Sequence, residues 1–416
     1  MTTGTDRPRR ITWVGWWRKE SSPRSWCPMP DPAAAPKPGI FVFNPSRRCA
    51  PGAYLFTQAV RFFLLNGHPL VRDIREAGII LVNSCCVTEG KIDTSLAALE
   101  TARAQGKGKT VILLGCLAGL PDAPFDPEGM LCVGPKDLDL LDAHFPHRIP
   151  VGAAAASRLP PEFFLPGQHL GPQDAFLFIG QGCVNGCSYC NIRRAKGGLA
   201  SVPVEAVLSR ARSGLDRGVR EFALLADDCA SYGRDIGSDL AELVAQLLGL
   251  DGGLSLKLSY VFPAFVEERF DDLAPLFATG RIRYANIPLQ SGSQRILDLM
   301  NRRYPVGRVV ERVRRLREIA PGSLLCTHVL INFPTETRDD FEASLALADA
   351  FRDTYFLHYS DNRGTPAALL EPKVPAEEAL WRLDAAADFV NARGRGVVIR
   401  DFDCDLPYNL SRDRGA

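Results

Sequence analysis

The decisive stretch of this 416-residue chain is Gln181-Gly-Cys-Val-Asn-Gly-Cys-Ser-Tyr-Cys190. Its three cysteines, Cys183, Cys187 and Cys190, have the spacing C-x3-C-x2-C. The apolar run 175–180 comes directly before it and predicts a β-strand. The stretch therefore predicts a loop at the end of a strand that carries three thiols close together.

Three thiolates on one short loop can hold three irons of a [4Fe–4S] cubane, which leaves the fourth iron without a protein ligand. A small molecule can bind that open iron and accept an electron from it. The same thiols could instead be buried core cysteines or part of a zinc knuckle whose fourth ligand lies elsewhere. Zinc sites usually pair two C-x2-C units or combine Cys with His, and no histidine lies near this loop. The pattern therefore favours the cluster.

The composition, with 46% apolar and 23% charged residues, is that of an ordinary soluble globular protein long enough for two or three domains. A net charge of +1 gives no electrostatic reason to expect binding of a long polyanion. No membrane span and no signal peptide are expected, because the chain lacks a continuous apolar run of sufficient length. Twelve cysteines, several in cluster spacing, predict metal ligation in a reducing cytoplasm.

The N-terminal part divides into a tail and a first domain. Residues 1–38 are rich in Pro, Arg and Ser and predict a disordered tail, although their four tryptophans could dock on the protein body or on a partner. Residues 39–150 alternate continuous apolar strands with helices, which indicates a parallel sheet covered on both faces. The predicted strands and helices are 39–43, 54–65, 78–84, 95–105 and 110–115.

Three cysteines stand where these strands end. Cys49 follows the first strand, Cys85 the second and Cys116 the third. The carboxyl ends of parallel strands lie on one edge of a sheet, where open α/β folds place their ligands. Each thiol alone would more often be a small core residue, but their shared position predicts a second cluster site.

The remaining chain predicts a linker, a second α/β domain and a C-terminal extension. Residues 151–174 are punctuated by Pro and Gly, and residues 175–366 contain six β/α units, which predict a curved, partial (β/α)6 barrel. Residues 367–416 predict one amphipathic helix and a charged tail. The predicted barrel strands are 175–180, 221–225, 254–261, 284–289, 324–331 and 354–359.

The cysteine loop, with the aromatic Tyr189 before its last cysteine, resembles that of the radical S-adenosylmethionine (SAM) enzymes. Together with Cys49, Cys85 and Cys116, it looks like the radical SAM methylthiotransferases, which modify a tRNA adenosine or an aspartate of a ribosomal protein. The resemblance covers roughly residues 39–383. Further stretches that resemble the family are Asn83-Ser84-Cys85, Leu114-Gly115-Cys116, 226–235, 287–302, 333–337 and 364–367.

The chain departs from the family pattern at several positions. Arg48-Cys49-Ala-Pro-Gly stands for the family's Gly-Cys-x-x-Asn, so Cys86, beside Cys85, is an alternative ligand. His328 replaces an acid, and Asn362 replaces an arginine. The chain also ends before the small β-barrel that binds the substrate in family members, which together with the near-zero charge disfavours RNA.

The resemblance implies SAM and two [4Fe–4S] clusters. The cluster at Cys183, Cys187 and Cys190 would bind SAM and cleave it reductively to a 5′-deoxyadenosyl radical, with an electron donor such as flavodoxin or ferredoxin. The cluster at the other three cysteines would deliver the sulfur. We expect Tyr189 to lie against adenine. Asp228 and Gln290 could contact SAM or substrate, or be ordinary polar residues at strand ends.

Three functional hypotheses follow. The first is a methylthiotransferase-like enzyme that inserts a methylthio group, or sulfur, at an unactivated C–H bond of a peptide, protein or natural product. The alternative is a tRNA or ribosomal-protein methylthiotransferase whose substrate is bound by a separate subunit. A non-catalytic iron–sulfur scaffold or redox sensor is the third. His328 and five further cysteines are expected to be core or incidental residues: Cys27, Cys132, Cys229, Cys326 and Cys404.

Overall fold

The structure is a computed structural model that describes residues 36–45, 49–154, 175–394 and 396–399. The predictions for the tail before residue 36, for most of the linker and for the last residues, with Cys27 and Cys404, lie outside these ranges. No helix in the described ranges is long and apolar enough to cross a membrane.

The N-terminal sheet is parallel throughout, as the sequence predicts, and its strand order is β1-β2-β3-β4. Its two central strands are buried because their apolar runs face helices on both sides. The fourth strand was not predicted, since it has only four residues and follows a segment rich in Pro, Asp and Gly. The strands are β1 (Gly39–Phe43), β2 (Ala77–Ser84), β3 (Thr110–Gly115) and β4 (Met130–Val133).

Two helices cover this sheet. Helix α1 (Ala50–Leu65) packs on one face and α2 (Glu89–Gln105) on the other. Both begin earlier than predicted: α1 has a proline in its first turn, and α2 is capped by Thr88, whose side chain accepts a hydrogen bond from the N–H of Lys91. The earlier start of α1 places Cys49 at its N-cap. Shorter elements are α3 (Leu140–His144) and the 3-10 turns η1 (Ile74–Glu76), η2 (Leu117–Gly119) and η3 (Val151–Ala154).

The second sheet has seven parallel strands in the order β13-β12-β11-β10-β9-β8-β5. All six predicted strands are present. The prediction of a charged tail was wrong at residues 397–399, which add a seventh strand too short to show periodicity. The strands are β5 (Ala175–Phe178), β8 (Glu221–Leu225), β9 (Ser255–Leu258), β10 (Ile282–Asn286), β11 (Leu324–Ile331), β12 (Asp353–His358) and β13 (Val397–Ile399).

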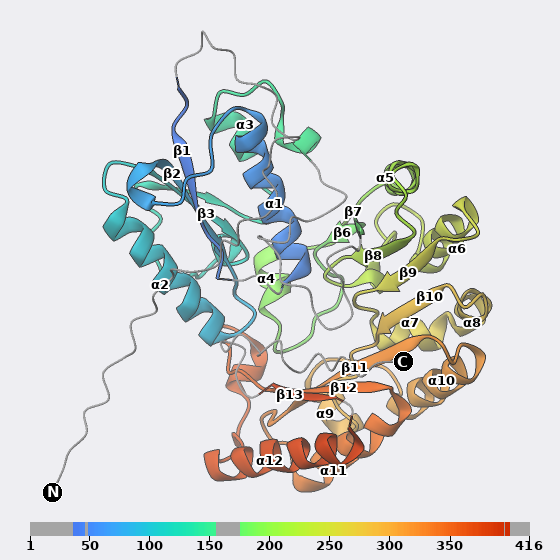
Figure 1. Ribbon diagram of the computed structural model, residues 1–416. Coiled ribbons are helices and arrows are strands. Elements are labelled where there is room, and N and C mark those ends of the chain that lie inside the picture. The colour runs from blue at the N-terminus through green and yellow to red at the C-terminus, as the bar shows by residue number, and fades with distance from the viewer. Residues whose placement is uncertain (1–35, 46–48, 155–174, 395, 400–416) are drawn as a thin grey trace, which may run out of the picture.

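Helices line the outer side of this curved sheet, and the largest apolar core lies between them and the strands (Figure 1). No pairing between β5 and β13 closes the sheet within the described residues. The helices are α5 (Val204–Asp216), α6 (Leu240–Leu250), α7 (Pro263–Glu268), α8 (Phe270–Ala278), α9 (Gln294–Leu299), α10 (Val306–Ile319), α11 (Arg338–Leu347) and α12 (Ala376–Arg393). The cysteine loop is framed by the hairpin β6 (Gly180–Gln181) and β7 (Ala200–Ser201) and by α4 (Asn191–Lys196).

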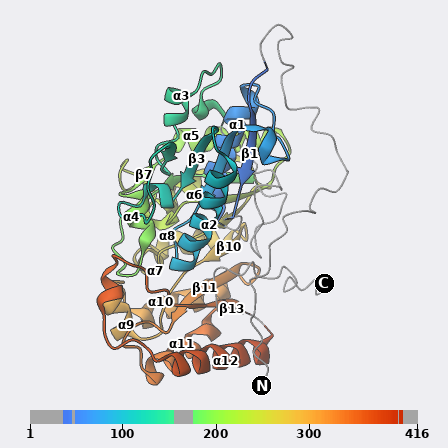
Figure 2. The ribbon, with the colours of Figure 1, turned by 90° about the vertical axis from the view of Figure 1, so that its left-hand side faces the viewer.

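The two sheets are joined through the first turns of α1. Tyr54 stacks on Phe178 of the barrel with ring centroids 5.1 Å apart and ring planes 8° from parallel. Ala50 and Leu55 belong to the same apolar cluster. In Figure 2, seen from the side of the N-terminal domain, α1 and α2 lie in front of parts of the barrel domain. This contact brings the strand-end cysteines of the N-terminal sheet toward the barrel.

Candidate functional site

The loop with the C-x3-C-x2-C spacing is fixed at both ends. Gly182 has φ +77, and a Cβ there would lie 2.0 Å from the carbonyl oxygen of Gly198, so only glycine fits. At the other end, Cys190 is the N-cap of α4. The loop therefore presents its three thiols from a rigid frame.

Hydrogen bonds reach all three sulfur atoms, and that of Cys190 accepts them from the backbone N–H groups of Ile192 and Arg193. Asn185 donates to Cys183 Sγ through its backbone N–H at 3.4 Å and its side-chain amide at 3.3 Å. Arg302 donates from Nη1 to Cys187 Sγ at 3.3 Å. Burial, helped by the charges of the neighbouring thiolates, raises the pKa of Cys190 to about 11. Burial also raises the pKa of Cys183, so a positive centre such as a cluster iron would be needed to hold Cys183 and Cys190 as thiolates.

Arg302 was not singled out from the sequence as a site residue, although it ends the family-like stretch 287–302. It is 3% exposed, donates from Nη2 to the Pro288 carbonyl at 2.6 Å, and lies over the Phe262 ring with its Cζ 4.4 Å from the centroid. Only its contact with Cys187, far away in sequence, shows that it supports the loop.

Asp228 lies beside the loop, but its carboxylate is occupied. It accepts hydrogen bonds from the Asn185 amide at 2.9 Å, the Ser231 hydroxyl at 2.6 Å and two backbone N–H groups, those of Ala230 and Phe262. Asp228 therefore fixes the position of the Asn185 side chain, which donates a hydrogen bond to Cys183 Sγ. A direct contact of Asp228 with SAM or substrate stays a prediction.

Gln290 differs from Asp228. Its backbone has φ 73 and is held between the carbonyl of His328 and the N–H of Leu330, each at 2.8 Å. Its side-chain Oε1 is buried and has no hydrogen-bond partner among the described residues, so it can still accept a hydrogen bond. Tyr189 meets Phe333 edge-on with centroids 6.4 Å apart. Their predicted contacts with SAM or substrate remain predictions.

The second group of thiols lies at the carboxyl edge of the N-terminal sheet. Cys49 caps α1, while Cys85 and Cys116 directly follow β2 and β3. Burial and the charges of Cys85 and Cys116 raise the pKa of Cys49 to about 12, so the three thiols are neighbours. Gly115, with φ +105, permits this geometry, because a Cβ there would lie 2.5 Å from the Ser84 carbonyl oxygen.

Cys86 also belongs to this group. It shares a hydrogen bond with Cys116, and this bond lowers the pKa of the Cys116 thiol. Its side chain is fully buried in an apolar cluster with Leu117 and Ile92. The structure thus brings both alternative ligands, Cys49 and Cys86, to Cys116, and the choice of Cys49 stays a prediction.

The chemistry of these donors fits iron–sulfur clusters. Within the described ranges, no group of three or more His, Cys, Asp or Glu side chains is arranged to hold a single metal ion. In a cubane each cysteine binds a different iron, and soft sulfur donors are its usual protein ligands. The two groups of thiols are therefore candidate cluster sites.

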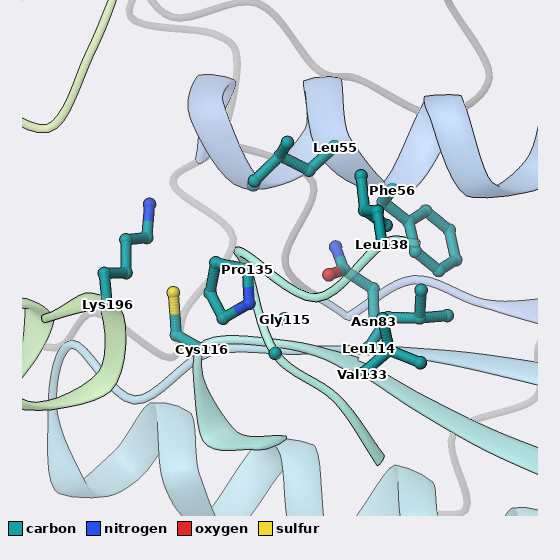
Figure 3. A pocket seen from close by; sticks show the side chains of 12 residues that line it. Leu55, Phe56, Asn83, Leu114, Gly115, Cys116, Val133, Pro135, Leu138 and Lys196 are labelled. Atoms are coloured by element: carbon teal, nitrogen blue, oxygen red, sulfur yellow. The ribbon is translucent and has the colours of Figure 1, made fainter. Parts of the chain in front are cut away.

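A buried ion pair lies between the two groups. Lys196 Nζ is 2.6 Å from Asp227 Oδ1, and Asp227 Oδ2 accepts a hydrogen bond from the N–H of Gly182 at 2.8 Å. Lys196 also lines a cavity of about 20 Å³ together with Cys116 and Asn83 (Figure 3). Neither Lys196 nor Asp227 was predicted as a site residue, because their pairing depends on tertiary structure.

The loop after β12 is hydrogen-bonded to segments next to both groups of thiols. Asn362, which stands where the family has an arginine, donates from Nδ2 to the carbonyls of Val87 and Tyr189, each at 3.2 Å. Glu89 accepts a hydrogen bond from the N–H of Arg363 at 2.7 Å. One loop therefore links the segment after Cys86 to the cysteine loop.

Comparison with known proteins gives consistent results. Residues 177–348 match the Radical SAM superfamily. The chain is 30% identical over 370 residues to threonylcarbamoyladenosine tRNA methylthiotransferase from Danio rerio, covering 84% of this chain and 67% of that protein. With the Drosophila melanogaster protein of the same name it shares 31% identity over 72% of this chain and 56% of that protein. The chain thus spans only part of these relatives.

A second kind of relative is bacterial. Ribosomal protein uS12 methylthiotransferase RimO from Citrobacter koseri is 33% identical over 337 residues, which cover 76% of this chain and 74% of that protein. Among solved structures, the radical SAM methyltransferase TsrM from Kitasatospora setae aligns with a TM-score of 0.53 at 16% identity, over 77% of this chain and 73% of that one. The latter likeness concerns the fold alone.

Proposed function

The chain belongs to the radical SAM methylthiotransferase family, and from this premise we propose that it inserts a methylthio group, or sulfur, at an unactivated C–H bond of a peptide, protein or natural product. Members of this family are enzymes that transfer sulfur-containing groups and use SAM and [4Fe–4S] clusters. The observation that carries the proposal is the presence of two groups of thiols, one on the radical SAM loop and one at the sheet edge, joined by a buried ion pair.

Each group has its own proposed ligands. Cys183, Cys187 and Cys190 would hold the cluster that binds SAM, and Cys49, Cys85 and Cys116 the cluster that donates sulfur. When bound, the clusters and SAM supply the electron, the hydrogen-abstracting radical and the sulfur.

The chain's own residues position these groups. Asn185 and Arg302 donate hydrogen bonds to the sulfur atoms of the loop, and Asp228 holds Asn185 in place. Tyr54 and Phe178 pack the two domains together through apolar surface, which fixes the N-terminal domain against the barrel. Gln290 is the proposed acceptor for a polar group of SAM or substrate, because its Oε1 is buried without a partner.

The relatives favour a second candidate substrate class. Their names refer to a tRNA nucleoside and to ribosomal protein uS12. We therefore also consider a tRNA or ribosomal-protein reaction in which a separate partner binds the substrate. Nucleoside digests of tRNA and mass spectra of ribosomal proteins, each compared with and without the protein, would separate this candidate from a peptide or small-molecule reaction.

We propose that the electron donor, an acidic carrier such as flavodoxin or ferredoxin, docks beside the radical SAM loop. A polar cavity of about 400 Å³ lies against residues 184–186, and Arg234, Arg303 and Glu268 line it. Arg193 adds a further positive charge, since it donates to the Val184 carbonyl at 3.1 Å. Arginines thus outnumber the single acid around the exposed part of the loop, which suits an acidic partner.

The test is an iron count combined with SAM cleavage. After anaerobic reconstitution we expect about eight irons per chain, as two cubanes. Replacing Cys49, Cys85 and Cys116 by Ala should leave about four irons and retain release of 5′-deoxyadenosine after reduction with dithionite. Replacing Cys183, Cys187 and Cys190 should also leave about four irons but abolish that release. If the first triple variant keeps all its iron, the sulfur-donor site is wrongly placed.

A further inference from the structure

The buried pair of Lys196 and Asp227 is attached to both ends of the radical SAM loop. Lys196 is the last residue of α4, the helix that Cys190 caps. Asp227 accepts a hydrogen bond from the backbone N–H of Gly182, the residue directly before Cys183. The side chains of the pair are 1% and 9% exposed. A lysine buried to this extent is stable only if neighbouring groups compensate its charge.

The ammonium group of this pair faces the other group of thiols. Lys196 and Cys116 line the same small cavity, and Figure 3 shows their side chains next to each other at one end of it. The pair is therefore a buried dipole whose positive member, Lys196, lies beside the cavity that Cys116 also lines.

We propose that Lys196 is a positioning residue for the sulfur-donating site: its ammonium group stabilises the negative charge of the thiolate-ligated cluster and of a sulfur anion held there, while Asp227 ties that charge to the radical SAM loop. The inference rests on the proposed function, because it requires a cluster at the sheet-edge thiols. The cavity beside Cys116, of about 20 Å³, has room for one atom-sized ligand such as a sulfide.

Removing the charge of Lys196 or of Asp227 should shift the midpoint potential of the sheet-edge cluster in opposite directions. Lys196→Met removes the positive end, so the reduced, more negative cluster is less stable and its midpoint potential falls. Asp227→Asn leaves the ammonium unbalanced, so the potential rises. A purely structural role would instead reduce the iron content in both variants without shifts of opposite sign.

The experiment uses the full chain with Cys183, Cys187 and Cys190 replaced by Ala, so that only the sheet-edge cluster remains. Its midpoint potential is followed by electron paramagnetic resonance during a redox titration. Lys196→Arg is the conservative variant and should shift the potential least. Glu336→Gln is the matched control. It alters another buried pair, Glu336 with Arg382 of α12 at 2.9 Å, at the opposite end of the molecule from β3 (Figure 1), and should leave the potential unchanged.

A lower potential in Lys196→Met and a higher one in Asp227→Asn support the proposal. No shift in either, or shifts of the same sign, overturn it. If Lys196→Met does not retain its cluster, Asp227→Asn decides alone, since only a raised potential agrees with the charge argument. If the cysteine background itself holds no iron, the proposed function fails and this inference with it. If the cysteine background holds iron but its midpoint potential does not shift as predicted in the variants, only this inference is refuted and the proposed function is not affected.

Discussion

The two groups of thiols are built in different ways. The radical SAM loop holds its three cysteines within eight consecutive residues, half-exposed and hydrogen-bonded by Asn185 and Arg302. The sheet-edge group collects Cys49, Cys85 and Cys116 from a helix start and two strand ends, and two of these thiols are buried. A short loop can form its site locally, whereas the sheet edge has a site only when the whole N-terminal domain has folded.

This difference explains where each group draws its electrostatic support. The loop receives hydrogen bonds from within its own domain, from Asn185 two residues after Cys183 and from Arg302. The sheet-edge thiols have Lys196 beside them, which α4 of the other domain brings to the cavity that Cys116 lines. The second site is therefore expected to be more sensitive to changes in the contact between the domains.

The largest expected effect tests the composition of the sheet-edge group. Cys85→Ala should remove about four irons, because the sulfur-donating cluster loses a ligand. Cys86→Ala is the matched control and should keep about eight irons, since the Cys86 side chain is packed in an apolar cluster. Iron analysis after anaerobic reconstitution measures both. If Cys86→Ala loses iron while Cys85→Ala or Cys49→Ala retains it, then Cys86 is a cluster ligand in place of that cysteine.

The next prediction concerns the support of the loop by a distant residue. Arg302→Met should lower the free energy of unfolding by about 3 kcal/mol, because the Pro288 carbonyl and Cys187 Sγ lose their buried donor. The neighbouring, exposed Arg303→Met should change it by less than about 0.5 kcal/mol. Urea unfolding of the cluster-free protein gives both values. Equal effects in the two variants would show that the loop does not need Arg302.

A smaller effect concerns His328, whose neighbour Tyr260 lies within reach of the charge of Cys49. His328 contacts Tyr260 with ring centroids 5.9 Å apart, and burial together with the Cys49 charge raises the pKa of Tyr260 to about 12. Burial lowers the pKa of His328 from 6.5 to about 4. Its contribution to stability is therefore complete above pH 6.5 and is lost as the pH falls toward 4.

The loss of unfolding free energy should amount to about 2 kcal/mol, which is less than the full pKa shift would give, because the His328 side chain is partly exposed. Unfolding of the cluster-free protein at a series of pH values, compared with His328→Asn, isolates this contribution. We expect the difference between the two proteins to change between pH 6.5 and 4. A constant difference over that interval would contradict the buried neutral histidine.

The smallest expected effect concerns electron delivery to the loop. Arg234→Glu should slow reduction by flavodoxin by up to about tenfold at low salt, because it reverses one charge beside residues 184–186. Glu268→Gln, in the same cavity, should speed it up. Stopped-flow absorbance at two ionic strengths measures both rates. If the reduction rate changes neither with salt nor with either substitution, the electron donor binds another face of the protein.

Much of the candidate site follows from residues that are close in the chain. The spacing of Cys183, Cys187 and Cys190 is a local property, and the apolar runs before Cys85 and Cys116 indicated buried parallel strands, which the structure contains. The short strands β4 and β13 did not show in the sequence, because three or four residues carry no usable periodicity.

The sequence by itself determined which residues could carry the proposed chemistry, namely three thiols on a loop after a strand and three more near strand ends, and it showed the resemblance to the radical SAM methylthiotransferases. Only the tertiary structure decided how the two groups are connected. Arg302 reaches Cys187 across 115 positions, and Lys196 reaches Asp227 across 31. A buried charge needs a partner within about 4 Å, and which residue provides it depends on how the domains pack rather than on any pattern along the chain.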